Sequence, residues 1–425
     1  MPQQKVMNRW IVVIGALGIQ LCLGSLYAWS IFVNPLKHQY GYTTTQAQAI
    51  FSTTLAVFAF AMIFAGRLQD KFGPRFTAIT GSILFAAGYF LSGFTNGSFT
   101  GLLCTIGILA GAGIGFGYVS PIAALVKWFP DKRGLMTGVA VAGFGAGALV
   151  FARAANHFIM TTGVMSAFFN LGTIFFAVCI PSSFILCNPP EKWLPQGWSP
   201  KRKKNTPAFQ DFTWREMICT KQFWMLWFMF ITGASAGLMV IGNLKPFGVH
   251  NGLAILEASS AVGILAIFNG AGRIAWGMAY DKSGRVMSMS LMFFLQGIMM
   301  IALIKMGGTP MSLAIAAALI GFNFGGVFTM FPSSTADFFG TKFIGVNYAF
   351  VYTAYGIAGI IGPMLGGRIF DMTGSYLYAF VPAGIMCIVA SMIALLTRHP
   401  LEPDTNTEPE EIYSVCCQSD SSVRA

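Results

Sequence analysis

The chain carries the same short phrase twice, once in each half. The first copy reads Gly66-Arg-Leu-Gln-Asp70-Lys71-Phe-Gly73, and the second reads Gly277-Met-Ala-Tyr-Asp281-Lys282-Ser-Gly284. The copies lie 281 − 70 = 211 residues apart, and this offset also relates Pro35 to Pro246, Gly41 to Gly252, Gly115 to Gly326, Pro121 to Pro332, Gly134 to Gly345 and Gly145 to Gly356. Glycine and proline set backbone geometry and the approach of helices, so matched positions indicate matched architecture. We interpret the chain as one half-protein copied once.

Each half consists of apolar runs that are long enough to cross a membrane. Hydrophobic residues make up 55% of the 425 residues and charged residues 10%, so a soluble fold would lack polar surface. A membrane helix needs roughly 20 apolar residues. Such runs lie at about 10–33, 45–66, 76–96, 99–128, 134–158, 164–187, 220–246, 256–280, 286–306, 311–332, 344–370 and 376–397. We therefore predict an all-α membrane protein with twelve transmembrane helices in two six-helix halves.

Two polar stretches divide the chain into parts. The linker at 189–219 contains prolines and the basic cluster Lys201-Arg202-Lys203-Lys204, and the end of the chain is acidic and rich in serine. We expect an N-terminal six-helix bundle at 1–188, a cytoplasmic linker at 189–219, a C-terminal six-helix bundle at 220–400 and a disordered cytoplasmic tail at 401–425.

The basic residues indicate the orientation. With both ends cytoplasmic, 20 of the 26 lysines and arginines fall in the termini, the linker and the inner loops. This agrees with the positive-inside rule, so the net charge of +11 reflects topology and lies against anionic lipid. We expect an integral protein of the cell (inner) membrane with both termini in the cytoplasm, and no nucleic-acid partner.

Histidines and cysteines are scattered, without the spacing of a metal site or of a nucleophile with its base. We therefore expect neither an enzyme nor a metal or cofactor.

The repeated phrase Gly-x-x-x-Asp-Lys-x-Gly resembles the signature of the major facilitator superfamily, which implies two six-helix halves. Its glycines allow a tight turn, and its aspartate is placed to meet cationic side chains or helix ends on the cytoplasmic face. We expect the phrase to control conformational switching through Gly66, Asp70, Lys71, Gly73, Gly277, Asp281, Lys282 and Gly284.

A narrower resemblance, over about residues 8–400, is to the oxalate:formate antiporter family, which is related to the monocarboxylate transporters. The segments that carry it are Ala110–Tyr118, Lys127–Gly134, Asn269–Arg273, Phe331–Gly340 and Asn347-Tyr348. Members of that family carry small carboxylates. The linker and the tail lie outside this resemblance.

Arg273 is the residue that we expect to decide the substrate. It lies eight residues before Asp281, or about 12 Å of helix at 1.5 Å per residue, which places it near mid-membrane. A charge at that depth is costly unless it meets a partner or water. Either backbone carbonyls or Asp337 hold it, or it binds an anionic cargo, since a guanidinium pairs with a carboxylate in bidentate fashion. Asn269, one turn earlier, can donate a further hydrogen bond.

Aromatic residues at helical spacing surround this charge in the sequence, and tyrosine at depth needs a hydrogen-bond partner. The resemblance implies pocket positions at Tyr27, Tyr118, Phe144, Phe324, Phe328, Phe331, Tyr352 and Tyr355. It also shows two departures. The oxalate exchanger has a second cation, a lysine, where this chain has Tyr355. Animal monocarboxylate transporters have an acid where this chain has Asn269.

One fixed cation suits one carboxylate. We predict a secondary active transporter of small monocarboxylates of the lactate, pyruvate or formate class, working by alternating access with protons as the expected coupling ion. An oxalate:formate-type anion exchanger is the alternative, if another cation such as Lys245 reaches the cavity. A non-transporting carboxylate sensor is the alternative from another class.

Overall fold

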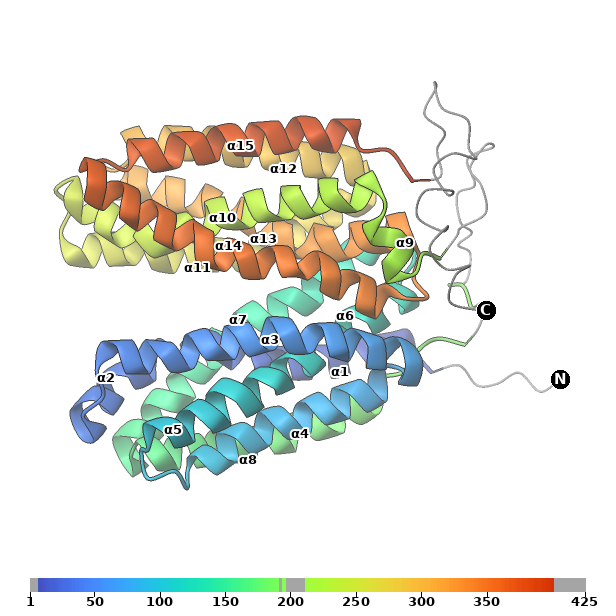
Figure 1. Cartoon of the computed structure of the whole chain (residues 1–425), viewed down its shortest axis with the longest axis horizontal. Helices are drawn as coiled ribbons and strands as arrows, with labels where there is room; N and C mark the ends of the chain where they lie inside the picture. The colour runs from blue at the N-terminus through green and yellow to red at the C-terminus, as the bar shows by residue number, and fades with distance from the viewer. Residues whose placement is uncertain (1–6, 191–192, 196–210, 401–425) are drawn as a thin grey trace, which may run out of the picture.

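The computed structural model describes residues 7–190, 193–195 and 211–400, and these residues form helices and turns in two bundles (Figure 1). The first bundle contains α1 Arg9–Leu23, α2 Ser30–Tyr40, α3 Thr44–Phe72, α4 Pro74–Ser92, α5 Phe99–Leu102, α6 Gly111–Trp128, α7 Arg133–Thr162 and α8 Val164–Ile185. After the short helix α9 Trp214–Ile218, the second bundle contains α10 Lys221–His250, α11 Ile255–Ser283, α12 Arg285–Ala302, α13 Pro310–Phe339, α14 Ile344–Thr373 and α15 Leu377–Leu396. Shorter helical turns are η1 Gly24–Ala28, η2 Leu103–Ala110 and η3 Leu303–Lys305. The basic linker cluster and the tail expected at 401–425 lie outside the described residues.

The helices follow the apolar runs of the sequence. In the described part of the chain, 11 helical stretches are long and apolar enough to cross a membrane. The remaining expected span is α4, which has 19 residues and packs against α6 and α8. Its polar side chains, Arg75, Thr77, Thr80 and Ser82, lower its mean hydropathy. The prediction of an all-α chain is confirmed for the described residues.

The first expected span is interrupted. The run at 10–33 forms α1, then the tight turn η1, and then α2, which continues to Tyr40. At Gly24 this segment crosses α7 so closely that a Cβ would come within 2.7 Å of the carbonyl carbon of Phe144. Gly41, with φ of 70°, ends α2.

The repeated phrase lies mainly on helices and not in loops. Both α3 and α11 continue through the aspartate and lysine, and only Gly73 and Gly284 form the turns. Their φ angles of 83° and 79° lie in the region that favours glycine. A helix can continue beyond its apolar stretch because polar side chains also sustain helical structure in water. Asp70 and Asp281 are thereby fixed on the last turn of a helix.

The two bundles contact each other through α3 with α14, and through α7 with α11 and α13. We call one end of the molecule the linker end: there α1 begins, α15 ends and α9 lies (Figure 1). The turns at Gly73 and Gly284 are at this end.

Candidate functional site

Arg273 lies inside the molecule on α11, with 4% of its surface exposed. Its Nε donates to Oδ1 of Asn269 at 2.9 Å. Its Nη1 donates to the carbonyl oxygen of Val141 on α7, which belongs to the other half. Its Cζ lies 4.9 Å from the centre of the Phe328 ring, within the range of a cation–π contact. Among the described residues, the guanidinium thus has an amide, a carbonyl and an aromatic ring as partners, and no carboxylate.

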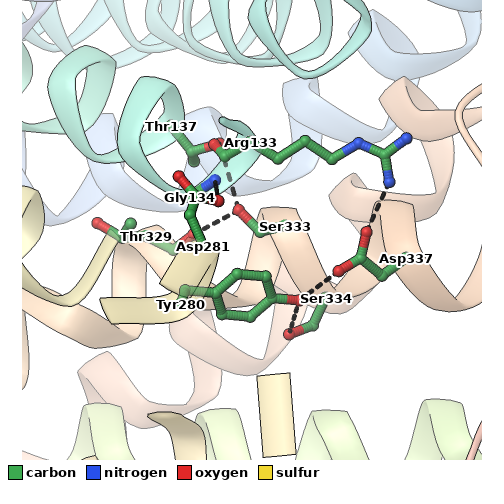
Figure 2. Close-up of polar contacts among 9 residues, drawn as sticks. All are labelled: Arg133, Gly134, Thr137, Tyr280, Asp281, Thr329, Ser333, Ser334 and Asp337. Atoms are coloured by element: carbon green, nitrogen blue, oxygen red, sulfur yellow. Dashed lines mark hydrogen bonds and ion pairs between the residues drawn. The ribbon is translucent and has the colours of Figure 1, made fainter. Parts of the chain in front are cut away.

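Asp337 is engaged elsewhere, so the alternative in which it holds Arg273 is wrong. Its Oδ1 accepts from Nη1 of Arg133 at 2.6 Å, and its Oδ2 accepts from the hydroxyl of Tyr280 at 2.7 Å (Figure 2). The residue of α13 at the level of Arg273 is Thr329, whose hydroxyl donates to the Arg273 carbonyl at 2.8 Å. Asp337 lies eight residues further along α13, or about 12 Å. A backbone carbonyl, that of Val141, does contact Arg273.

A glycine on α7 leaves room for the guanidinium. A Cβ on Gly145 would lie 3.2 Å from Nη1 of Arg273 and 3.4 Å from its Cζ. Gly145 follows Val141 by one helical turn, so both face Arg273 from the opposite half. The position of the arginine head is therefore set by α7 as well as by its own helix.

The aromatic residues expected around Arg273 come together from both halves. A series of ring contacts, with centroids 5.2–5.4 Å apart, joins Tyr27 to Phe144, Phe144 to Tyr118, Tyr118 to Tyr352, Tyr352 to Tyr355, Tyr355 to Phe328 and Phe328 to Phe324. The hydroxyls of Tyr27 and Tyr355 lie 3.5 Å apart across the two halves. Tyr27 is 37% exposed and Tyr355 is half-buried, whereas Arg273 is almost fully buried. Aromatic rings therefore separate the charge from the exposed side of the cluster.

One expected pocket residue lies behind the others. Phe331 is fully buried and stacks on Phe230 of α10 at 4.3 Å. Phe230, which the sequence reasoning did not include, contacts Phe328, Tyr352 and Tyr355 directly. Phe331 therefore supports the cluster from behind Phe230.

The repeat could have identified two further residues. Phe58, which contacts Tyr118 and Tyr352, stands 211 residues before Asn269. Val141 stands 211 residues before Tyr352. Asn269 and Tyr352 were expected at the site, and the 211-residue offset from each of them leads to Phe58 and Val141.

The two aspartates of the repeated phrase each bind the start of a helix in the opposite half. Asp70 accepts from the backbone N–H of Gly345 at 3.0 Å and of Val346 at 2.9 Å, at the start of α14. Asp281 accepts from Gly134 at 2.8 Å and Leu135 at 2.8 Å, at the start of α7. A carboxylate is favourable there because helix N-termini carry unpaired N–H groups and partial positive charge. Because Gly134 and Gly345 are repeat mates, the two contacts are equivalent.

Glycines allow the helices to meet at these contacts. A Cβ on Gly66 would lie 2.7 Å from the carbonyl carbon of Gly345, and a Cβ on Gly277 would lie 2.8 Å from that of Gly134. The lysines of the phrase contribute differently: Lys71 lies over the ring of Phe72 at 5.1 Å, and Lys282 is exposed. The aspartates and the helix-face glycines therefore make the inter-half contacts.

A third set of contacts lies beside the contact of Asp281 with Gly134. Arg133 reaches from α7 across to Asp337 of α13, and the Ser333 hydroxyl donates to the Thr137 hydroxyl at 3.4 Å (Figure 2). By the 211 offset, Arg133 corresponds to Ile344 and Asp337 to Val126, so this ion pair has no counterpart. At the linker end the halves are thus joined by two contacts that the repeat relates to each other, and by one ion pair that has no counterpart in the repeat.

Sequence comparison decides the family. The model of the Major Facilitator Superfamily matches residues 14–363 and 239–417. The chain belongs to the major facilitator superfamily.

Similar superfamily members include an oxalate:formate antiporter. The one from Oxalobacter formigenes is 30% identical over 412 residues, covering 95% of this chain and 96% of the relative. The uncharacterized MFS-type transporter YhjX of Escherichia coli (strain K12) is 29% identical, covering 84% and 88%. Monocarboxylate transporter 13 of Bos taurus is 25% identical, covering 92% and 89%.

Among solved structures, the superfamily transporter FucP in the outward conformation has a TM-score of 0.67 at 14% identity, covering 91% of this chain and 98% of that one. Superfamily membership and this likeness confirm the predicted twelve-helix major facilitator fold. The chain is accordingly an integral membrane protein.

Proposed function

We propose that this protein carries small monocarboxylates of the lactate, pyruvate or formate class across the cell membrane by alternating access around Arg273. The observation that carries the proposal is one buried guanidinium, enclosed by aromatic rings, whose partners are neutral. A single anionic group on the substrate would balance the positive charge of this buried guanidinium. The names of the relatives, an oxalate:formate antiporter and monocarboxylate transporters, support a carboxylate cargo.

A second charge for a dianion is lacking near Arg273 in the described chain. Lys245, the candidate second cation, follows Phe230 on α10 by 15 residues, or about 22 Å of helix. It is exposed near the end of α10. This favours a monocarboxylate over oxalate.

The basic residues support a cytoplasmic linker end. The carboxylate contacts of Asp70 and Asp281 and the ion pair of Arg133 close that end. In this orientation the conformation is closed toward the cytoplasm. We propose that transport requires these contacts to break. Asn269 stands where animal monocarboxylate transporters have an acid, so a titrating acid–arginine pair does not supply the coupled proton, and we propose that the substrate enters with its own proton.

Counterflow in proteoliposomes tests the proposal. We expect wild-type protein to exchange labelled formate, lactate or pyruvate. Arg273→Ala should lose this exchange, because its affinity for the acid should fall by far more than 10-fold, which corresponds to about 1.4 kcal/mol of binding free energy. A pH gradient should drive net uptake of the same acid.

Three results would contradict parts of the proposal. Stronger exchange of oxalate than of lactate would favour the anion exchanger. Binding without counterflow would favour the sensor. Arg273→Ala with near wild-type binding would show that the arginine has a structural role only.

A further inference from the structure

The described end of the linker, just before α9, is fastened to the turn between α13 and α14 and to the helix ends beside it. The backbone N–H of Phe212 donates to the carbonyl oxygen of Phe339 at 3.0 Å, and Nδ2 of Asn347 donates to the carbonyl oxygen of Phe212 at 2.9 Å. Oδ1 of Asp211 accepts from the backbone N–H of Lys342 at 3.0 Å. The Phe212 ring is buried and packs edge-on against Phe339, with centroids 5.7 Å apart. These contacts fix the path by which the chain enters α9.

The corresponding turn of the first half, between α6 and α7, is fastened by the start of α1. Nη1 and Nη2 of Arg9 donate to Oδ1 and Oδ2 of Asp131 at 2.7 and 3.1 Å, and the guanidinium lies over the Phe129 ring. Asp131 stands 211 residues before Lys342, so the two turns are repeat mates. Each turn leads into a helix whose start receives an aspartate of the opposite half. In both halves, the segment that enters the half therefore holds a turn that takes part in the contact between the halves.

Helix α9 lies at the linker end beside α14 (Figure 1), and its first residue, Trp214, contacts both halves. The indole ring stacks on Phe350 of α14, with centroids 5.1 Å apart and planes at 7°. Cζ of Arg67 on α3 lies 5.3 Å from the centre of the indole, within the range of a cation–π contact. Because Phe350 belongs to the second bundle and Arg67 to the first, the indole joins the two.

The contact of Arg67 with Trp214 occurs on one side of the pseudo-symmetric molecule. The repeat mate of Arg67 is Met278, which carries no charge. Arg67 precedes Asp70 by three residues on α3, so its contact accompanies that of Asp70. The contact of Asp281 is accompanied instead by the ion pair of Arg133. Each of the two equivalent aspartate contacts thus has beside it a different contact of an arginine with the opposite half.

We propose that residues 211–218 of the linker are part of the closure at the linker end. Backbone hydrogen bonds hold this segment on the second bundle, and the Trp214 ring binds Arg67 of the first bundle. When the halves separate at this end, Arg67 must leave the indole. The linker therefore stabilises the closed conformation in addition to connecting the halves, with Trp214 as the residue that positions Arg67.

Arg215 supplies a matched control. Its Cζ lies 5.4 Å from the centre of the same indole ring, but it belongs to the same segment as Trp214 and so does not join the halves. Both arginines are exposed. Arg67→Gln and Arg215→Gln therefore each remove one exposed cation beside one indole, and only the first removes a contact between the halves.

The readout is the rate at which a polar maleimide reacts with Ser333→Cys in a protein whose eight native cysteines are replaced. Ser333 is fully buried and contacts Thr137 of the opposite half, so the introduced cysteine should react when the halves separate at the linker end. We expect Arg67→Gln to raise the rate about 2- to 5-fold, the size of one exposed cation–π contact, and Arg215→Gln to leave it unchanged. Equal rates in the two variants would overturn the inference. Because no substrate is added, the result does not depend on the proposed transport of monocarboxylates.

A double-variant cycle assigns the effect of Arg67 to the indole. Trp214→Leu keeps an apolar side chain beside Phe350 but offers no π face to a cation. In the Trp214→Leu protein, Arg67→Gln should therefore cause no further increase in the labelling rate. An increase of the same size with Trp214 and with Leu at this position would show that Arg67 acts through another partner, contrary to the proposal.

If Trp214→Leu does not accumulate in the membrane, Trp214→Phe replaces it in the cycle. Phenylalanine retains a ring that can stack on Phe350, but its π face attracts a cation less strongly than that of tryptophan. Arg67→Gln should then raise the labelling rate by a smaller factor than it does with Trp214 in place. A factor that is equal or larger would equally overturn the inference.

Discussion

At the residue scale, the site combines one cation with neutral polar and aromatic partners. Arg273 is screened by Asn269, Val141 and Phe328, and Tyr355 stands beside Phe328 with its hydroxyl toward Tyr27. A monoanion can neutralise this site, whereas a dianion would leave one carboxylate without a cation. Discrimination is a difference between two affinities. In the described part of the chain no second cation contacts this cluster, so we expect it to disfavour a dianion.

Tyr355→Lys tests charge matching at this position. Two buried like charges repel in the empty site, so we expect monocarboxylates to bind no better than in the wild type, while oxalate gains relative affinity by about 5- to 30-fold, or 1–2 kcal/mol. Competition of oxalate against lactate in a binding assay measures the shift. Tyr355→Phe, which lacks the hydroxyl but adds no charge, is the control. Unchanged selectivity in Tyr355→Lys would place this side chain outside the site.

At the element scale, the important units are the helix ends that receive the aspartates. Asp70 and Asp281 lie on the last turns of α3 and α11, and each accepts two N–H groups from the first turn of a helix in the other half. These contacts lie at the linker end, and Asp281 is about 12 Å of helix from Arg273. We therefore expect them to affect the movement of the halves and not the recognition of substrate.

Asp70→Asn and Asp281→Asn test this division of roles. Asparagine has one acceptor oxygen and no charge, so each variant loses at least one charge-assisted hydrogen bond in the closed conformation, worth about 1 kcal/mol after allowance for solvent exposure. We expect altered turnover with substrate affinity within about 3-fold of the wild type. Transport rates and equilibrium binding of the same acid measure the two quantities. A large loss of affinity with normal turnover would contradict the assignment.

The sequence predicted these elements better than the contacts between them. The apolar runs predict the helices, because hydrophobicity and length are properties of each segment by itself. The 211-residue offset predicts the two halves, because it matches glycines and prolines of one half with those of the other. The sequence did not predict that α3 and α11 continue through the aspartates, since polar residues can end a membrane span without ending a helix. The Val141 partner of Arg273 was also hidden, because every residue has a carbonyl and only tertiary packing selects one. The inward position of Phe331 depends on Phe230 of another helix for the same reason.

At the scale of the whole molecule, the closed linker end is the sum of separate contacts. Two are equivalent by the repeat, at Asp70 and Asp281, and the ion pair of Arg133 with Asp337 has no counterpart. The bond of Arg273 to Val141 lies deeper in the molecule. All of them join one half to the other, so we expect each to bias the same conformational equilibrium.

Combining Asp70→Asn with Asp281→Asn tests this common equilibrium. The two contacts share no residue, so their effects on the free energy of closure should add, and the population ratios should multiply. If each single variant raises the open population at the linker end about 5-fold, the double variant should raise it about 25-fold. Maleimide labelling of Ser333→Cys, in a protein whose eight native cysteines are replaced, measures the populations. A double variant no more reactive than either single one would show that the two contacts open together as one unit. Independent contributions predict the product, and the equivalence of the two sites predicts that the single variants behave alike.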